Sequence, residues 1–248
     1  MYILEMRKLK DTTSYPLLIK AILVLISVFY LAFLYIDLYR HEYAYLSNNV
    51  KFTCIILCFI LSLLSGKNSF DTHSMKLLQL GLFLTVIADY FLLIVRDYYE
   101  IGIIVFSVVQ ITYSIRYDMK NKGFFLHKYI VLLVVIFLSH YLINSIVRID
   151  LLVPISIFYG ACLIISVYKA IGVYVHNIYP KINGIMVFGG MILFLLCDIN
   201  VAMYNIFKYL NKTDIIIYKV SNISIWLYYL PSQVLLSLSG YKYKSVRR

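Results

Sequence analysis

The chain has 248 residues, of which 62% are hydrophobic and only 14% are charged. A soluble domain is about 45–50% apolar and about 25% charged, so this composition excludes a water-soluble globular protein. Glycine and proline are scarce and the four cysteines fall in apolar runs, which excludes collagenous, disordered and disulfide-rich classes. The net charge of +11 does not indicate nucleic-acid binding, because the basic residues are spread over short loops between apolar segments. The sequence therefore predicts an all-α polytopic membrane protein.

Eight segments are long and apolar enough to cross a bilayer, for which about 20 residues suffice. In chain order we expect spans at 16–37, 51–66, 77–96, 101–117, 127–147, 151–171, 182–207 and 219–239. Pro231 should kink the last of them. The connections are too short to form a separate soluble domain, so we expect a single integral membrane domain over 1–248, with polar tails at 1–15 and 240–248.

The distribution of lysine and arginine predicts the orientation in the membrane. The two tails and the second, fourth and sixth connections contain 15 of the 23 basic residues, the other connections contain 7, and Lys20 lies inside the first span near its cytoplasmic end. Since basic loops remain on the cytoplasmic side, both termini are expected in the cytoplasm. We expect the protein in the cell (plasma) membrane, surrounded by membrane lipid. The sequence carries no expectation of an oligomeric state.

Two carboxyl groups lie well inside predicted spans, and such groups are functional candidates because they are costly to insert. Asp89 is in the third span and Asp198 is in the seventh. Each is about 12–16 residues from the cytoplasmic end of its span, or roughly 18–24 Å at 1.5 Å per residue. Equal depth suits a general acid and a general base acting on one substrate. The alternatives are interhelical hydrogen bonds that only fix packing, or a path for protons or cations.

Further polar side chains share helical faces with each other or with these carboxyls. On the fourth span Gln110 belongs to a polar stripe with Tyr113 at its edge, and on the eighth Tyr229 and Gln233 are four residues apart. We expect the following residues to line a substrate cavity with the two aspartates: Lys51, Gln110, Tyr113, Asn205, Tyr229 and Gln233. Taken singly, each is also typical of an interhelical hydrogen bond or an interface anchor.

Four motifs in order resemble the YhhN family, eight-span membrane proteins that include the lysoplasmalogenases. Residues 81–113 contain GLFLTVIADYFLL, YEIG and FSVVQITY, and resemble the third and fourth spans of that family. Lys51-Phe-Thr resembles its Lys-Pro-Leu/Thr start of span two, FLLCD at 194–198 its Ser-Asp helix, and YLPSQ at 229–233 its closing helix. The resemblance covers about residues 50–238. Gln110 stands where the family has histidine, so a proton-transfer role of that histidine is not carried over.

The resemblance implies hydrolysis of the vinyl ether bond of a lysoplasmalogen, a lysophospholipid substrate, without a metal or other cofactor. Asp89 and Asp198 would be the acid and base, in either order, and Lys51 would hold the phosphate. A non-enzymatic transporter of lipids or small solutes, or an ion-coupled carrier, would use the same carboxyls. Carriers more often have helices broken in paired spans, and here only Pro231 interrupts a span, which favours the enzyme. A structural scaffold, the third reading, would have no cavity around the two aspartates.

Overall fold

The computed structural model describes residues 16–118 and 125–243, and all elements in these ranges are helical. The eight long helices are α2 (Leu17–Tyr39), α3 (Ala44–Gly66), α4 (Thr72–Asp89), α5 (Tyr99–Tyr117), α6 (Phe125–Asn144), α7 (Leu152–Val175), α8 (Lys181–Tyr209) and α9 (Ile216–Leu238). A 3₁₀ turn, η1 (His41–Tyr43), precedes α3, and a π-helix, η2 (Tyr90–Val95), follows α4. The predicted all-α bundle is confirmed.

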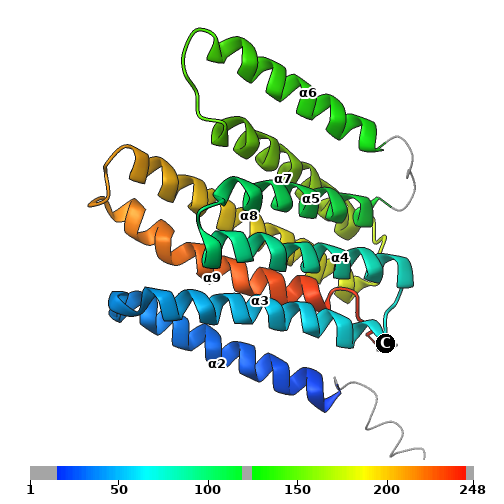
Figure 1. The fold of residues 1–248 in the computed structure, drawn as a ribbon. Coiled ribbons are helices and arrows are strands. Elements are labelled where there is room, and N and C mark those ends of the chain that lie inside the picture. Colours follow the sequence, from blue (N-terminus) through cyan, green and yellow to red (C-terminus); the bar gives the residue numbers. More distant parts are fainter. Residues whose placement is uncertain (1–15, 119–124, 244–248) are drawn as a thin grey trace, which may run out of the picture.

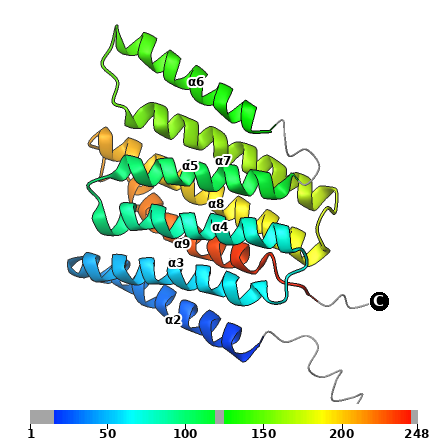
Figure 2. The same ribbon diagram turned by 45° about the vertical axis from the view of Figure 1, so that its right-hand side comes forward.

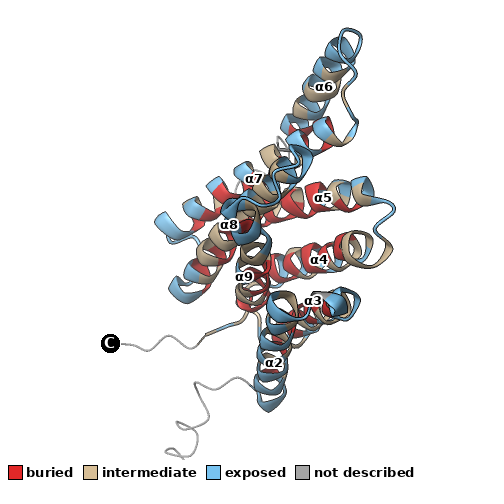
Figure 3. Ribbon diagram, turned by 90° about the vertical axis from the view of Figure 1, so that its left-hand side faces the viewer, coloured by how far each residue is buried: buried red, intermediate tan, exposed pale blue. Residues whose placement is uncertain are grey.

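The helices form two layers that pack face to face (Figures 1 and 2). One layer has the order α3, α4, α5 and the other has the order α9, α8, α7. Contacts of α3 with α9 and of α5 with α7 join the layers at their two edges. Seen from the end of the bundle, α2 and α6 lie outside this core, α2 against α3 and α9 and α6 against α7 (Figure 3). Thus α4 and α8 are the middle helices of their layers.

Six helical segments in the described ranges have the length and composition of membrane spans, the third being α4 together with η2. Their apolar side chains cover the outer surface of the bundle, as expected of a multi-pass membrane protein. The predicted spans 101–117 and 219–239 do form helices, α5 and α9, but neither is among the six. Both helices direct polar side chains inward, including Gln110 and Gln233, which lowers their hydropathy.

Helix α3 begins at Ala44, so the predicted start at residue 51 is wrong by about two turns. The polar segment before Lys51 is helical because it packs against the end of α2. Ser47 donates a hydrogen bond to Asp37 Oδ1 at 2.5 Å, and both Ser47 and Lys51 are buried. Tertiary contacts therefore stabilise two helical turns that lack the apolar composition of a span.

The predicted third span, 77–96, changes its helical form in the middle. Regular α-helix ends at Asp89, and the π-helix η2 continues to Val95, where Arg96 has a positive φ of 62°. Gly102 of α5 packs against this part of the chain, and a Cβ there would lie 2.6 Å from Leu92 Cδ2. Single π-helical turns are rare and are frequently found at functional sites. Here the irregular turn begins next to one of the two candidate carboxyls.

Helix α9 continues through Pro231, at which the sequence predicts a kink. A proline within a helix leaves the carbonyl four residues earlier without its usual donor. That carbonyl belongs to Leu227, and it accepts a hydrogen bond of 3.1 Å from the Tyr30 hydroxyl of α2. The peripheral helix α2 thus satisfies a backbone group that the proline leaves unpaired.

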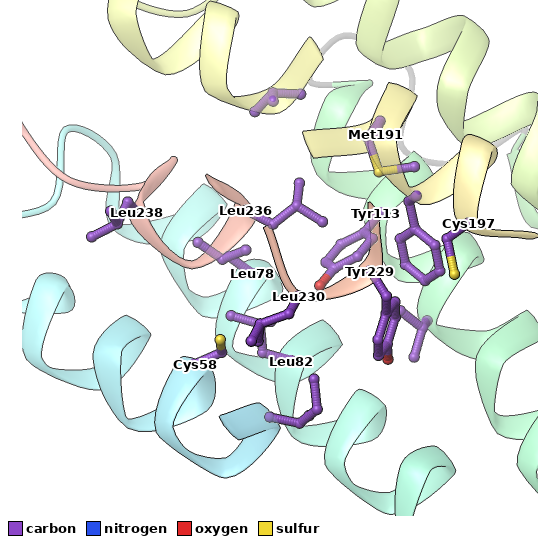
Figure 4. Packing of buried hydrophobic residues seen from close by; sticks show 14 of the residues in the cluster. Cys58, Leu78, Leu82, Tyr113, Met191, Cys197, Tyr229, Leu230, Leu236 and Leu238 are labelled. Carbon is purple, nitrogen blue, oxygen red and sulfur yellow. The ribbon is translucent and has the colours of Figure 1, made fainter. Parts of the chain in front are cut away.

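The core between the layers combines aliphatic, sulfur-containing and tyrosine side chains from α3, α4, α5, α8 and α9 (Figure 4). All four cysteine thiols are buried and unpaired, as expected of small packing residues. The predicted tail 240–248 begins with an ordered contact, since Tyr241 bridges to Ser69 and the Lys242 amide donates to the Asn68 carbonyl at 2.7 Å. The predicted tail 1–15 and residues 244–248 lie outside the described ranges.

Candidate functional site

Asp89 and Asp198 occupy equivalent positions on the two middle helices of the bundle. Asp89 is the last residue of α4, which has 18 residues, and the segment from Lys181 to Asp198 of α8 has the same length. Both helices begin at the same end of the bundle (Figure 1). At 1.5 Å per residue, each carboxyl lies about 26 Å along the axis from that end. The predicted equality of depth therefore has a structural basis in equal helix register.

Asp89 is almost fully enclosed, with 3% of its surface exposed. Its Oδ2 accepts a hydrogen bond of 2.6 Å from the hydroxyl of Tyr229 on α9. The Tyr229 ring packs edge-on against Trp226 at 5.2 Å and Phe194 at 5.6 Å between ring centres. The aromatic contacts fix the Tyr229 hydroxyl in place. This hydroxyl holds Oδ2 of Asp89, and Oδ1 is left available for another partner.

Asp198 is half-buried, and its Oδ2 accepts a hydrogen bond from the hydroxyl of Tyr159 on α7. Gln110 of α5 is fully buried beside this pair. Its Oε1 accepts a hydrogen bond of 2.6 Å from Ser166 of α7, and its amide interacts electrostatically with Tyr159. Gln110 is therefore linked to Asp198 through Tyr159, whose hydroxyl donates to the carboxylate.

Phe106 of α5 joins the two aspartate–tyrosine pairs into one cluster. Its ring centre lies 6.1 Å from that of Tyr159 and 6.4 Å from that of Tyr229. The carboxyls of Asp89 and Asp198 are close enough to interact electrostatically. We refer to the two aspartates, Tyr159, Tyr229 and Phe106 as the carboxyl cluster. It brings the two carboxyls together inside an otherwise apolar bundle.

Lys51 lies at the edge of this cluster but is already paired. Its Nζ is 2.7 Å from Asp37 Oδ2 and 5.1 Å from the centre of the Trp226 ring, which in turn packs on Tyr229. Only 7% of the residue is exposed. The sequence suggests a phosphate ligand for this ammonium group, whereas the structure provides a carboxylate. A phosphate would have to displace Asp37 or bind beside it.

The remaining expected residues lie outside the carboxyl cluster. Asn205 donates a hydrogen bond of 2.9 Å to the Val201 carbonyl of its own helix and interacts with Tyr99, which also interacts with Asp198. Tyr113 stacks on Tyr117, nearer the opposite end of the bundle. Gln233 is fully buried, and within the described ranges neither of its amide atoms has a hydrogen-bond partner. Tyr113 and Gln233 thus form no hydrogen bond with either aspartate in the described part of the chain.

Sequence reasoning missed Tyr159, Asp37, Trp226 and Phe106. Tyrosine and tryptophan in apolar segments are typical of membrane interfaces, so the two rings gave no separate signal. Asp37 lies at the end of the first span, where a carboxylate reaches water. The short connection from Asp37 to Lys51 was the available signal, because it keeps opposite charges close together across a helical hairpin.

A cavity of about 190 Å³ lies elsewhere, between α6 and α7, and is lined by Ser139 and His140 among apolar residues. Neither aspartate lines it. Access to the carboxyl cluster is instead indicated by the partial exposure of Asp198, in contrast to Asp89. Asp198 is therefore the more accessible of the two carboxyls.

Comparison with protein families gives a match to the YhhN family over residues 46–240, close to the range of about 50–238 expected from the motifs. Comparison with functionally curated proteins and with solved structures gives no match. The matched region contains both aspartates, their tyrosine partners and seven of the eight long helices, from α3 to α9. This multi-pass membrane protein belongs to the YhhN family.

Proposed function

We propose that this protein is an intramembrane hydrolase that cleaves the vinyl ether bond of a lysoplasmalogen. The observation that carries the proposal is the pair of membrane-embedded carboxyls, each hydrogen-bonded to a tyrosine and joined by one aromatic cluster. Membership of a family that resembles the lysoplasmalogenases supports it. The substrate class is the one that the resemblance to the family implies, and a site within the bilayer is open to a lysophospholipid.

The reaction begins with transfer of a proton from a carboxylic acid to the alkene carbon that is β to the ether oxygen. This step forms an oxocarbenium ion, and the second carboxylate stabilises its positive charge. Water then adds to the cationic carbon and gives one proton to that carboxylate. The resulting hemiacetal breaks down to a fatty aldehyde and the glycerophospho-base: its hydroxyl returns a proton to the first carboxylate, and the second carboxylic acid gives its proton to the leaving glycerol oxygen, which restores both groups. The net reaction consumes one water molecule, and no proton is gained or lost.

We infer the two roles from the difference in burial. Transfer from water disfavours a charged carboxylate, so the enclosed Asp89 is suited to be the protonated acid. Its Oδ1 is left to carry the proton because Oδ2 accepts the Tyr229 hydrogen bond. The half-buried Asp198 is suited to be the ionised base, with Tyr159 donating to it. With both termini in the cytoplasm of a cell (plasma) membrane, the two carboxyls lie in the outer half of the bilayer.

A carrier is the second candidate, and the π-helix next to Asp89 favours it, because carriers bind substrates at interrupted helices. The interruption is not paired, however. Helix α8 is continuous over 29 residues through Asp198. A carrier built from two matched broken helices would show the irregularity at both carboxyls, so the hydrolase is the better supported function.

The test measures aldehyde release from a 1-alkenyl lysophospholipid by the purified full-length protein in nanodiscs. Asp89→Asn and Asp198→Asn should each lower the rate by about 10²-fold or more, as expected for general acid–base groups. Asp214→Asn, a change to an exposed carboxyl in the connection between α8 and α9, is the matched control and should retain the full rate. The 1-acyl analogue should release no fatty acid. A wild-type protein that leaves alkenyl lipids intact, or full activity in either membrane variant, would refute the proposal.

A further inference from the structure

Arg116 is a buried cation that forms no ion pair with the residues that the structure describes. It belongs to the last turn of α5, and only 1% of its surface is exposed. Its Nε donates a hydrogen bond of 3.0 Å to Ser74 of α4, while the Nη1 and Nη2 atoms have no partner in the described protein. The rings of Tyr117 and Tyr179 each lie 5.7 Å from its Cζ. The guanidinium is thus fixed in orientation, with four N–H groups left to satisfy.

Two acidic residues close in the chain to Arg116 or to Ser74, its hydrogen-bond partner, are engaged elsewhere. Asp71 caps α4 by accepting from the Ser74 amide at 2.6 Å, and Asp118 pairs with Lys169 at 3.1 Å. A buried donor without an acceptor costs about 1–3 kcal/mol, and more when it is charged. Buried groups of this kind are usually satisfied by internal water.

Two tyrosine hydroxyls lie between Arg116 and the carboxyl cluster. Tyr117 and Tyr113 are one turn apart on α5, their rings stack at 6.3 Å, and both hydroxyls are buried without a hydrogen-bond partner in the described ranges. The Tyr113 hydroxyl interacts electrostatically with both Arg116 and Thr85 of α4. Thr85 precedes Asp89 by one helical turn, and both are buried. Polar groups therefore follow one another from Arg116 to Asp89.

Apolar side chains surround the polar groups between Arg116 and Asp89, so few hydrogen-bond partners from the described protein are within reach. Leu78, Leu82 and Leu236 are fully buried in the same part of the core, where Figure 4 shows Tyr113 among leucine side chains. The Tyr113 ring lies directly against Gly81, where a Cβ would be 2.9 Å from its Cζ. The absent side chain at Gly81 admits the tyrosine, and with it a hydroxyl, to an apolar layer.

We propose that Thr85, Tyr113, Tyr117 and Arg116 bind a file of internal water molecules that leads from the end of the bundle at which α4 begins to Asp89. Because the inference rests on the proposed hydrolase, its use is to supply the water that adds to the oxocarbenium carbon. Of the two hydrogens of that water, one goes to Asp198 and one remains on the hemiacetal. Lipid excludes water from the sides of the bundle, so a membrane-embedded hydrolase takes in water through one of the two ends of the bundle.

The charge of Arg116 gives the file its selectivity. A fixed cation beside a narrow water path repels protons and metal cations but admits neutral water, as arginine does in water channels. Arg116 lies at the end of the file, next to Tyr179 in the connection between α7 and α8. Water would therefore pass Arg116 first, while the membrane remains closed to protons.

Radiolytic hydroxyl-radical labelling in H₂¹⁸O tests the file in the full-length protein in nanodiscs. Radicals form from the water itself, so a buried ring is labelled only where water is bound next to it. Tyr113 and Tyr117 should take up ¹⁸O at least about tenfold faster than Phe33 and Phe194, which are equally buried in the same bundle. Labelling of both tyrosines at the slow rate of these phenylalanines would overturn the inference.

Two variants complete the test. Arg116→Met should lower the labelling of Tyr117 several-fold without unfolding the protein, and Tyr113→Phe should lower the aldehyde release rate several-fold. Tyr30→Phe, which removes a hydroxyl on the peripheral helix α2, is the control for both. Since labelling needs no substrate, fast labelling of an inactive wild-type protein refutes the hydrolase and leaves the file intact. An active enzyme with unlabelled tyrosines refutes the file alone.

Discussion

Removing the charge of Asp37 should destabilise the bundle because it strands the ammonium group of Lys51. Lys51 Nζ and Asp37 Oδ2 are 2.7 Å apart. The side chain of Asp37 is 25% exposed and that of Lys51 is 8% exposed. Asp37→Asn retains the size of the side chain and an acceptor for Ser47, but it leaves Lys51 with only the rings of Phe33 and Trp226. Loss of one partner from a buried pair costs about 3–5 kcal/mol. Since Asp37 is partly exposed, we expect a loss at the lower end, about 3 kcal/mol.

The assay is reversible unfolding of the purified protein in mixed micelles by titration with SDS, followed by circular dichroism. Glu42→Gln is the matched control, because it breaks an ion pair at the surface. Glu42 is 64% exposed and its partner Arg40 is 57% exposed. An exposed pair is worth at most about 1 kcal/mol, and we expect a change below about 0.5 kcal/mol. The double variant Asp37→Asn with Lys51→Met removes both charges and should return to within about 1 kcal/mol of the wild type.

Two results would refute this reasoning. If Asp37→Asn and Glu42→Gln change the free energy of unfolding equally, the Lys51 ammonium group is not dependent on Asp37. If the double variant is as unstable as Asp37→Asn alone, the loss comes from the altered side chain at position 37 and not from the stranded charge. Either outcome would reopen Lys51 as a free ligand for the phosphate of a substrate.

Three further predictions follow from the same structure. Tyr159→Phe should lower the rate of aldehyde release by about tenfold and lower the free energy of unfolding by about 1.5–3 kcal/mol, because it removes a hydrogen bond to a charged group; an unchanged rate would show that Asp198 needs no donor for the reaction. Gly81→Ala should destabilise the protein by about 1–3 kcal/mol in the SDS titration, since its methyl group collides with Tyr113, and a neutral result would contradict that packing. A tag at the C-terminus should stay unlabelled from outside intact cells, and labelling there would reverse the topology and the depth assigned to Asp89.

The sequence was sufficient to predict which segments are helical and which acidic groups are unusual. Apolar runs of about 20 residues form helices in a membrane wherever they occur, because every backbone group must be paired within its own segment. A carboxyl inside such a run is conspicuous without any knowledge of its neighbours, as for Asp89 and Asp198. The same local rule failed at the start of α3, where polar residues are helical through contact with α2.

Only the tertiary structure decided the partners of these groups. Tyr229 and Asp89 are 140 residues apart and Tyr159 and Asp198 are 39 apart, so no spacing along the chain connects them. The ion-pair partner of Lys51, the expected phosphate ligand, was hidden for the same reason, since Asp37 approaches it across a helical hairpin. Mean hydropathy measures the preference of a whole segment for lipid. It does not distinguish one face of the helix from another. Packing among the eight long helices of the described ranges decides which face of each helix meets another helix. Asp89 and Asp198 lie on such faces, each against a tyrosine of another helix.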